Sequence, residues 1–378
     1  MAKHSTNTKV QNNARNNRGR NRKNNNRKKK IIITFLLLII IIIGVICGFV
    51  INKLNKIEYT TLDTSMLNIS DNVPEGYRNI ALLAVDSRNV NSNNGSRTDG
   101  IIILSINEKT KEAKLASVYR DTYVEVEGHN LTKVTHAHAY GGPSLTIGTL
   151  NKNLDLNISE FATVNFEGVA NIIDIMGGIE IDIKQEELKQ MNKYIKDTSK
   201  NTGISSPQLS HAGRQKLNGV QAVTYGRIRK LAGGDYKRTE RMRTVIMTAF
   251  DKAKTMDIGT LNRMVDEILP KVQTNINSTE LLSLATQLSS YKITDSIGWP
   301  YEVKGKTLDA WYGVPVSLET NVKKLHEELF GQTEYEASES VKEISNKIIN
   351  KTGYRAIDNT TSNNTTSNST TSNTTRKK

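Results

Sequence analysis

Blocks of apolar and polar residues follow one another along this chain and predict strands and helices in turn. Short apolar runs at residues 79–85, 100–106 and 113–118 are typical of buried strands. The polar residues 107–111 separate the second run from the third, which predicts a hairpin. The first part of the folded region is therefore expected to be a sheet.

The rest of the chain alternates between the spacing of apolar residues typical of strands and the spacing typical of helices. Shorter strands are predicted at 160–165 and 180–183, whereas residues 184–212 are polar with a weak pattern and are expected to form an inserted lobe or loop. Helices are predicted at residues 145–154, 167–176, 217–229, 239–254, near 260–270, 279–289 and 318–330. This order predicts an α/β fold with a mixed central sheet flanked by helices.

Residues 31–51 form a continuous uncharged stretch rich in Ile and Leu. At about 1.5 Å per residue, such a helix is roughly 31 Å long, close to the thickness of a bilayer core. A buried core helix would show a polar face, and a signal peptide would have a shorter apolar region with a small-residue cleavage site. We therefore expect a single membrane anchor.

Charge along the chain predicts the orientation of that anchor. Eleven of the 52 Lys and Arg residues lie in residues 1–30, and only Lys53 and Lys56 follow the span closely. Basic residues collect on the cytoplasmic side, so the N-terminus is expected inside and the remainder outside the cell membrane. The single cysteine, Cys47, lies in the predicted span, which excludes a disulfide framework.

The net charge of +14 suggests a nucleic-acid partner until it is divided along the chain. Residues 52–354 hold 37 basic and 37 acidic residues, because the excess lies in the two tails. A neutral folded part argues against a basic nucleic-acid-binding domain. The predicted organisation is a disordered basic cytoplasmic tail, a transmembrane helix, a stalk, an extracellular domain and a disordered Thr/Ser/Asn-rich tail, at residues 1–30, 31–51, 52–78, 79–350 and 351–378.

Two Asp–Arg pairs flank the first two predicted strands. Asp86 and Arg88 follow the first strand, and Arg97 and Asp99 precede the second. If the strands are neighbours, both pairs meet at one sheet edge, where ligands of α/β proteins gather. Two carboxylates suit a hard cation such as Mg²⁺, and two arginines suit phosphate oxygens, although either pair alone would equally suit a salt-bridged loop.

The third strand also ends on a basic and an acidic residue, Arg120 and Asp121. Three such pairs at successive strand ends favour a ligand site over chance. Because the folded part is neutral overall, a local concentration of arginine there predicts a focused anion site.

More arginines follow near the predicted helices. Arg227 and Arg229 end the helical pattern of residues 217–229, and Arg238 and Arg241 are three positions apart on a helix expected to begin near Tyr236. Residues at that spacing share one face of a helix. This face could be a solvated basic surface or a second contribution to the anion site.

Other chemistries find little support in the sequence. His136 and His138 could bind zinc, but no further His or Cys lies near them. Residues 141–144 (Gly-Gly-Pro-Ser) are more typical of a turn and helix N-cap. The sequence contains no P-loop, Gly-x-Ser-x-Gly elbow or zincin motif.

Taken in order, these segments resemble the LytR-CpsA-Psr family of wall-polymer ligases. Each motif alone is weak, and the specificity comes from their combination and from the predicted topology of a short tail, one span and an exported domain. The stretches that carry the resemblance are residues 79–99, 103–124, 133–142, 161–182 and 217–241.

The resemblance implies a phosphotransferase that moves an anionic glycopolymer from an undecaprenyl-diphosphate carrier to a peptidoglycan hydroxyl. The implied partners are this lipid-linked polymer, peptidoglycan and membrane lipid, and nucleic acid is not among them. Two alternatives stay open: a diphosphatase that uses water as the acceptor, and, with less support, a membrane-bound transcriptional regulator whose basic tail binds nucleic acid.

The resemblance also assigns roles to individual residues. Asp86 and Asp99 match the family's Mg²⁺-binding aspartates, with Mn²⁺ as a substitute ion. Lys133 matches a lysine near the head group, and Arg120, Asp121 and Asp86 are the candidate catalytic residues, with Asp86 or Asp121 as the base. The residues that match its pyrophosphate-binding arginines are Arg88, Arg97, Arg120, Arg227, Arg229 and Arg238.

Two positions depart from the family pattern. Tyr119 stands where the family usually has Pro before the Arg–Asp pair, which is expected to alter a loop. Met242 stands where the family usually has Gln, which is expected to remove a polar side chain near the head group.

Overall fold

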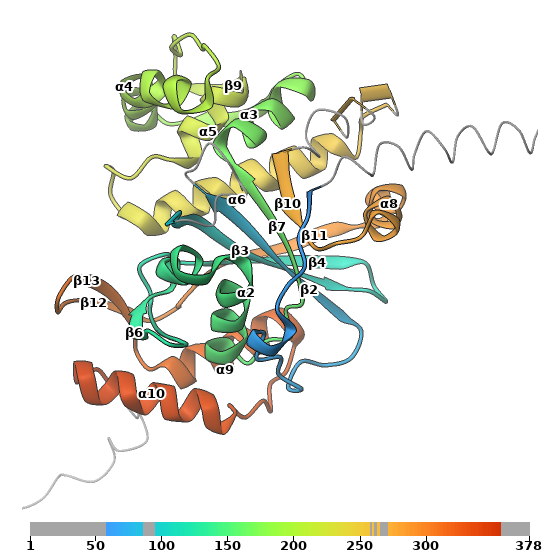
Figure 1. Ribbon diagram of the computed structural model, residues 1–378. Coiled ribbons are helices and arrows are strands. Elements are labelled where there is room, and N and C mark those ends of the chain that lie inside the picture. Colours follow the sequence, from blue (N-terminus) through green and yellow to red (C-terminus); the bar gives the residue numbers. More distant parts are fainter. Residues whose placement is uncertain (1–57, 86–94, 258, 261–262, 265–270, 357–378) are drawn as a thin grey trace, which may run out of the picture. The chain divides into compact units, whose positions relative to one another are not determined.

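Strands β2, β3 and β4 lie at the centre of the fold (Figure 1). The computed structural model describes residues 58–85, 95–257, 259–260, 263–264 and 271–356. The strands are β1 (Glu58–Tyr59), β2 (Tyr77–Val85), β3 (Thr98–Asn107), β4 (Glu112–Val118), β5 (Tyr123–Val126), β6 (Asn130–Lys133), β7 (Glu160–Asn165), β8 (Ile179–Ile183), β9 (Gly213–Leu217), β10 (Val272–Thr274), β11 (Lys292–Trp299), β12 (Val303–Thr307) and β13 (Trp311–Pro315). Seven of them form one mixed sheet in the order β1-β10-β7-β2-β3-β4-β11. The predicted α/β fold with a mixed sheet is confirmed.

Helices cover both faces of this sheet (Figure 1). They are η1 (Thr64–Met66), α2 (Val134–Leu154), α3 (Phe166–Ile175), α4 (Gln185–Thr202), α5 (Gly219–Gly226), α6 (Gly234–Ala253), α8 (Ser278–Thr286), η3 (Leu288–Ser290), α9 (Leu318–Phe330) and α10 (Glu339–Thr352). Helices α2, α9 and α10 pack together on one face, and α6 packs on β4 and β11. Helices α3, α4 and α5 form an adjoining lobe with the hairpin of β8 and β9.

Strand direction decides which residues meet. Strand β2 runs antiparallel to β3 and parallel to β7, while β4 runs antiparallel to β3 and parallel to β11. The carboxyl ends of β2, β4, β7 and β11 therefore share one sheet edge with the amino end of β3. The predicted neighbourhood of the first two strands and the predicted hairpin of the next two are both confirmed.

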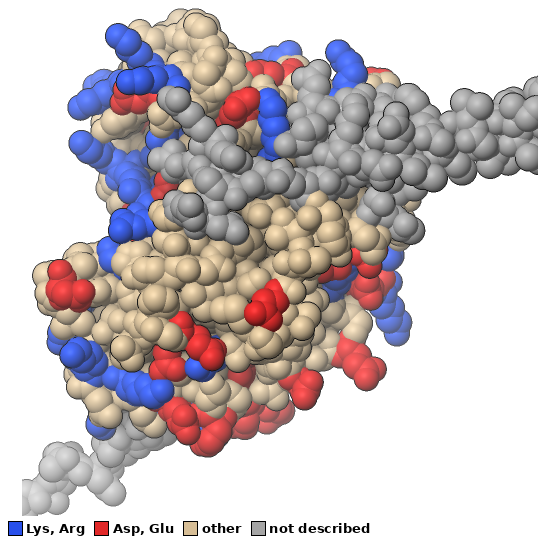
Figure 2. Space-filling model, viewed as in Figure 1, with Lys and Arg blue, Asp and Glu red and all other residues tan. Residues whose placement is uncertain are grey.

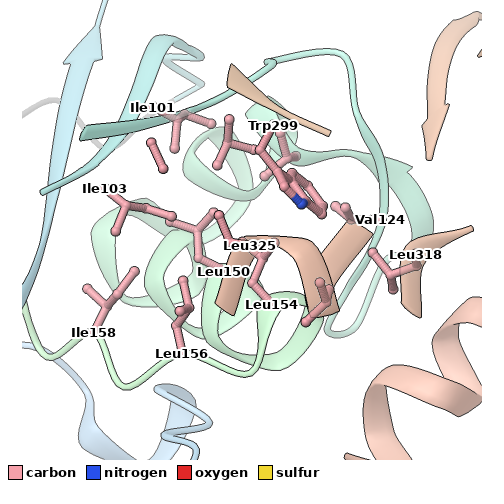
Figure 3. Packing of buried hydrophobic residues seen from close by; sticks show 14 of the residues in the cluster. Ile101, Ile103, Val124, Leu150, Leu154, Leu156, Ile158, Trp299, Leu318 and Leu325 are labelled. Atoms are coloured by element: carbon pink, nitrogen blue, oxygen red, sulfur yellow. The ribbon is translucent and has the colours of Figure 1, made fainter. Parts of the chain in front are cut away.

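Alternation along the central strands builds two cores. On β3, Ile101 and Ile103 face α2, where Leu150 and Leu154 are buried against them (Figure 3). Leu104 and Ile106 of the same strand belong to a second cluster, which includes Phe250 of α6. Burial on both faces explains why these strands are continuous apolar runs in the sequence.

Helix α2 is longer than the predicted helix 145–154, because it begins at Val134. Gly141 and Gly142 have non-helical backbone angles, and Pro143 opens the second half of the helix. The turn predicted at residues 141–144 is thus present as a kink, since proline cannot donate the hydrogen bond that would continue the first half.

Of the inserted lobe or loop expected at residues 184–212, the structure has the lobe, because most of the segment is helical. Helix α4 occupies this region, begins where the Glu187 carboxylate accepts a hydrogen bond from the Lys184 backbone N–H, and buries Leu188, Met191 and Ile195. These apolar positions are three and four residues apart, but the eight or more polar residues around them hide the period.

The predicted helix 217–229 is shorter and is preceded by an unpredicted strand. Residues of β9 pair with β8, Asn218 caps α5, and the helix ends at Gly226. Arg227 and Arg229 therefore lie in the connection to α6 rather than on a helix face. The strands at β11, β12 and β13 and helix α10 also went unpredicted.

The described part of the expected stalk packs onto the domain. Leu67 and Val73 are buried in the main core, and the Asn151 side chain donates a 2.7 Å hydrogen bond to the Leu67 carbonyl. Several predicted segments lie outside the described residues. They are the span 31–51, the tail before it, the part of the C-terminal tail beyond residue 356, and most of the helix predicted near 260–270. Among those described, no helix combines the length and apolar character needed to cross a bilayer.

A buried ion pair joins the α4 lobe to helix α6. Arg241 Nε lies 2.7 Å from Glu187 Oε1, and the two side chains are 8% and 5% exposed. Of the two interpretations of the helix face that carries Arg238 and Arg241, the solvated basic surface is wrong because both side chains are buried, and Arg241 is held by Glu187.

We expect Arg241→Ala to lower the free energy of unfolding by about 3–5 kcal/mol, because it leaves the Glu187 carboxylate buried without a partner. Urea unfolding followed by circular dichroism measures this change. The matched control is Arg214→Ala, which breaks the exposed pair with Glu180 and should cost at most about 1 kcal/mol. Equal effects of the two substitutions would contradict the importance of the buried pair.

Candidate active site

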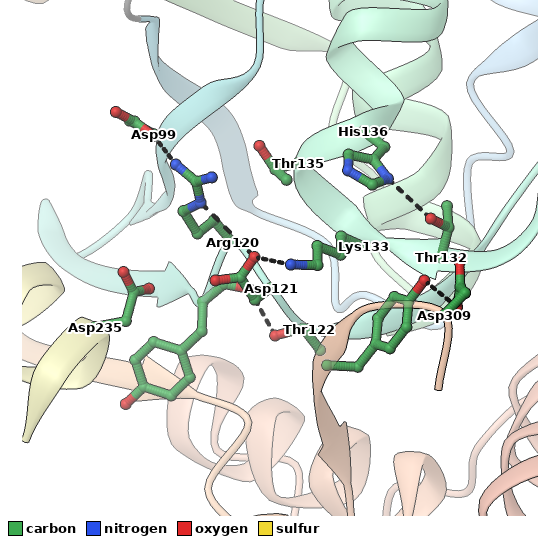
Figure 4. Close-up of polar contacts among 12 residues, drawn as sticks. Asp99, Arg120, Asp121, Thr122, Thr132, Lys133, Thr135, His136, Asp235 and Asp309 are labelled. Carbon is green, nitrogen blue, oxygen red and sulfur yellow. Dashed lines mark hydrogen bonds and ion pairs between the residues drawn. The ribbon is translucent and has the colours of Figure 1, made fainter. Parts of the chain in front are cut away.

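An ionic cluster lies at the sheet edge where β4 ends and β3 begins. Arg120 follows β4 and donates a hydrogen bond from Nη1 to Oδ1 of Asp99, the second residue of β3. Its Nε lies 3.8 Å from Oδ1 of Asp121. Figure 4 shows Arg120 between the two carboxylates. The antiparallel pairing of β3 with β4 is what brings these residues together.

Helix α6 and the connection before it complete the cluster. Arg238 Nη1 and Arg229 Nη2 lie 3.8 and 3.9 Å from Asp99 Oδ1. Asp235, one turn before Arg238, lies 2.9 Å from Arg238 Nη2 and 3.4 Å from Arg229 Nε. Three guanidinium groups thus surround one carboxylate oxygen of Asp99.

Burial makes this concentration of cations costly. The Arg238 side chain is 4% exposed, and burial lowers its pKa to about 10, with Arg229 and Arg120 lowering it further against the opposing effect of Asp235 and Asp99. The Arg238 guanidinium stays charged at neutral pH, and any additional anion nearby would stabilise that charge. Arg229 is 44% exposed, so a ligand can reach the cluster from that side.

Lys133 and His136 border the cluster on the α2 side. Lys133 Nζ lies 2.8 Å from Asp121 Oδ1, as Figure 4 shows. His136 Nδ1 lies 2.9 Å from the Thr132 hydroxyl, and burial lowers the pKa of His136, assisted by the nearby charges of Arg97 and Lys133. The imidazole is therefore mainly neutral at pH 7. Arg97 itself is exposed at this rim.

An apolar pocket opens beneath the cluster between the sheet and α3, α5 and α6. Its empty volume is about 740 Å³, part of it open to solvent, and its walls include Phe166, Val223 and Val245. The charged residues at this pocket are Asp99, Arg227, Arg229 and Arg238. The guanidinium of Arg227 lies 4.6 Å from the centre of the Phe166 ring. The pocket therefore combines an apolar interior with cations at one end, which suits an amphiphile with an anionic head.

The structure places most of the predicted site residues together. Arg227 joins them through the apolar pocket rather than through an ion pair, and Arg97 stands apart at the exposed rim. Asp86 and Arg88 lie outside the described residues. The residues found in the ionic cluster are Asp99, Arg120, Asp121, Lys133, Arg229 and Arg238.

Asp235 is a site residue that sequence reasoning missed. It pairs with both Arg229 and Arg238, and it lies in the first turn of α6 after Gly233. Its position three residues before Arg238 is a signal for an ion pair on one helix face, and that signal was present in the sequence.

The predicted two-carboxylate metal site can be compared with the structure at Asp99 only. The described residues include no group of three His, Cys, Asp or Glu side chains able to hold a metal ion. His136 bonds Thr132, whereas the buried His138 ring lies 3.0 Å from the Ser96 carbonyl, so the two histidines have separate partners. The carboxylate of Asp99 is the right donor type for Mg²⁺, and its proposed partner is Asp86.

The two departures from the family pattern have different surroundings. Tyr119 packs edge-to-face on Tyr236 of α6, with ring centres 4.5 Å apart. Met242 lines the apolar pocket, and its methyl group occupies the space that a side chain on Gly100 would need. The polar side chain that was expected to be lost at position 242 would have faced the apolar pocket, so Met242 makes the pocket lining more apolar.

Comparisons with known proteins agree with this picture. A model of the LytR_cpsA_psr family matches residues 46–331. The chain is 31% identical over 232 residues to the polyisoprenyl-teichoic acid–peptidoglycan teichoic acid transferase TagT of Bacillus subtilis, covering 60% of this chain and 69% of that protein. It is 30% identical to TagU of Oceanobacillus iheyensis, a transferase named in the same way, over 64% of this chain and 72% of the relative.

The fold recurs in solved structures. The structure of YwtF (TagT) with bound octaprenyl pyrophosphate lipid superposes with a TM-score of 0.54 at 23% identity, covering 73% of this chain and 98% of that one. At this identity the likeness establishes the fold alone.

We expect Arg238→Met to weaken the binding of inorganic pyrophosphate by about 10- to 100-fold, because one charge-assisted hydrogen bond contributes roughly 1.5–3 kcal/mol. Arg238→Lys should recover part of the loss, since it keeps the charge without the fork of donors. Isothermal titration calorimetry at fixed salt measures both. Arg214→Ala is the control for a lost surface charge, and unchanged binding by Arg238→Met would remove the cluster as the anion site.

Proposed function

The chain belongs to the LytR_cpsA_psr family, and from this membership we propose that it transfers an anionic glycopolymer from an undecaprenyl-diphosphate carrier to a peptidoglycan hydroxyl. The names of its relatives, which are teichoic acid–peptidoglycan transferases, support the substrate class. The observation that carries the proposal is the apolar pocket with Arg227, Arg229 and Arg238 at one end. A polyprenyl diphosphate has the same division between an apolar chain and an anionic head.

The arginines of the cluster are proposed to hold the diphosphate. Each guanidinium offers a planar fork of donors that matches phosphate oxygens. Arg238 is fixed by burial and by Asp235, so its donors are oriented before the ligand arrives. Arg120 now bonds Asp99, and a phosphate oxygen would compete for the same donors.

The reaction is a displacement at phosphorus. The acceptor hydroxyl oxygen forms a bond to the phosphorus that carries the sugar, and the bond from that phosphorus to the bridging oxygen breaks. The electron pair leaves with polyprenyl phosphate, an anion that needs little protonation at neutral pH. Charge grows on the bridging oxygen during this step, and Arg120, Arg229 and Arg238 stabilise it there.

Asp121 is proposed to accept the proton of the acceptor hydroxyl. Its carboxylate lies next to Arg120 and is held by Lys133 at 2.8 Å, which orients it. Asp86 is the alternative base. Because His136 beside this pair is neutral, it adds no further positive charge next to the Asp121 carboxylate.

Mg²⁺, or Mn²⁺ in its place, is proposed to bind Asp99 together with Asp86. Carboxylate oxygens are the ligands that these cations prefer, and Asp99 stands within the arginine cluster, where the diphosphate is proposed to bind. When bound, the ion would neutralise part of the diphosphate charge.

The location and the charge of the substrate fit the rest of the chain. The predicted span 31–51 would hold the domain at the outer face of the cell membrane, where a lipid-linked donor is found. Figure 2 shows Lys and Arg gathered over the α4 lobe, where Lys184, Lys189, Lys193, Lys196 and Lys200 are exposed. A basic surface of this kind attracts an anionic polymer.

We expect Arg120→Ala to reduce polymer transfer at least 100-fold, because it removes a donor that stabilises charge in the transition state. Transfer from a lipid-diphosphate donor to peptidoglycan is followed by product analysis, with Arg214→Ala as control. Full transfer by Arg120→Ala would contradict the proposed site. If the wild type forms only hydrolysed products in the presence of acceptor, the protein is a diphosphatase.

Removal of divalent cations should abolish transfer, and Mg²⁺ or Mn²⁺ should restore it. Asp99→Asn is expected to raise the Mg²⁺ concentration needed for half-maximal transfer by about tenfold, because one charged ligand is lost. Activity that is unchanged after exhaustive treatment with EDTA would exclude the ion from the reaction.

A further inference from the structure

A second cavity opens beside the ionic cluster, and we call it the aromatic groove. It has an empty volume of about 620 Å³, part of it open to solvent, and shares no lining residue with the apolar pocket. Its principal side chains are Tyr119, Asp121, Asp235, Tyr236 and Trp311. Nothing in the reaction described so far uses the three rings.

The rings of the groove are presented to solvent rather than buried in a core. Trp311 is 46% exposed and Tyr236 is 38% exposed, which is unusual for large apolar side chains of the described residues. The indole lies against Gly305 of β12, where a Cβ would stand 2.9 Å from the indole nitrogen. The hairpin of β12 and β13 thus positions the ring by leaving room for it. Tyr236 is held by its contact with Tyr119.

The groove also offers acceptors for hydroxyl groups. Asp121 reaches it from the cluster, and Asp235, whose side chain is 20% exposed, forms part of the same wall. Gly233 and Gly234 form part of the wall with positive φ angles of 86° and 48°, so backbone rather than side chain faces the cavity there. Carboxylates accept strong hydrogen bonds from hydroxyl donors.

Aromatic faces beside carboxylates select a particular chemistry. A pyranose ring has faces of C–H groups that pack on aromatic rings and an edge of hydroxyls that donate to carboxylates. A polyprenyl chain offers no hydroxyl donor to Asp121 or Asp235, and a diphosphate has no face of C–H groups to pack on the aromatic rings. The lining therefore favours a sugar ring.

The ion pairs of the cluster connect the two cavities. Asp235 of the groove pairs with Arg238 and Arg229 of the apolar pocket, and Asp121 of the groove is joined through Arg120 to Asp99 of that pocket. A ligand in the groove and the head of a lipid in the pocket would meet at these residues. In-line displacement requires the attacking and leaving oxygens on opposite sides of phosphorus.

We propose that the aromatic groove binds the acceptor, a saccharide whose hydroxyl is presented to Asp121 and the diphosphate. This inference rests on the proposed function and adds to it the place where the second substrate binds. Tyr236 and Trp311 hold the sugar ring, and Asp235 accepts one of its hydroxyls.

The two tryptophans of the chain allow a direct binding test. Trp299 is fully buried in the main core, whereas Trp311 lies in the groove. In the full chain in detergent micelles, acrylamide should quench Trp311 preferentially. A tetrasaccharide of alternating N-acetylglucosamine and N-acetylmuramic acid should reduce the quenching constant at least twofold. Trp311→Phe should abolish this protection.

Two further ligands show whether a sugar bound in the groove comes from the acceptor or from the lipid-linked donor. A prenyl diphosphate without sugar should leave the quenching unchanged, and the same lipid with a sugar should protect less than the tetrasaccharide. No protection by the tetrasaccharide would overturn the proposal. Protection by the lipid-linked sugar alone would assign the groove to the donor and also overturn it.

Kinetics give an independent test. Trp311→Ala should raise KM for the saccharide acceptor about tenfold and leave KM for the lipid donor unchanged. Tyr59→Ala, which removes another exposed ring, should change neither. An equal rise in both KM values would contradict the assignment. If the wild type transfers to no acceptor, the proposed function fails, while the quenching experiment still reports whether the groove binds a saccharide.

Discussion

The carboxylate of Asp99 is the interaction on which the site depends, because it faces three guanidinium groups at once. Arg120, Arg229 and Arg238 come from three separate segments, and their mutual repulsion in a partly buried place would drive them apart. Asp99, with Asp235 behind it, offsets that repulsion and leaves a cluster that keeps its affinity for anions. The fold serves this arrangement, since the antiparallel pairing of β3 with β4 puts Asp99 beside Arg120, and α6 brings Arg238 across the sheet edge.

The two cavities next to the cluster indicate which groups of a ligand the site can hold. The apolar pocket lies between the sheet and the helices of the α3–α5 lobe, whereas the aromatic groove is formed by the end of β4, the start of α6 and the β12–β13 hairpin. Groups from both cavities meet at the ion pairs between them. An apolar chain, an anionic head and a hydroxylated ring can thus each find matching surroundings within one site.

Much of the sheet and part of the site could be predicted from the sequence. Continuous apolar runs identify β2, β3 and β4, and strand ends that carry Arg and Asp point to Asp99, Arg120 and Asp121. Helix α4 was missed because its buried positions are diluted by polar residues, and the ion pair of Arg241 could not be foreseen because its partner Glu187 lies in that helix. The groove could not be predicted, since Trp311 comes from a hairpin far along the chain from Tyr119 and Tyr236.

The separate linings of the two cavities have a consequence for how the protein can change over evolutionary time. Substitutions in the groove alter surroundings that the apolar pocket does not share, and substitutions around Met242 alter a pocket that the groove does not share. Preference for one partner can therefore drift while preference for the other is retained, provided that the charged residues between them are kept. Duplicated copies of such a gene could diverge in one substrate without losing the other.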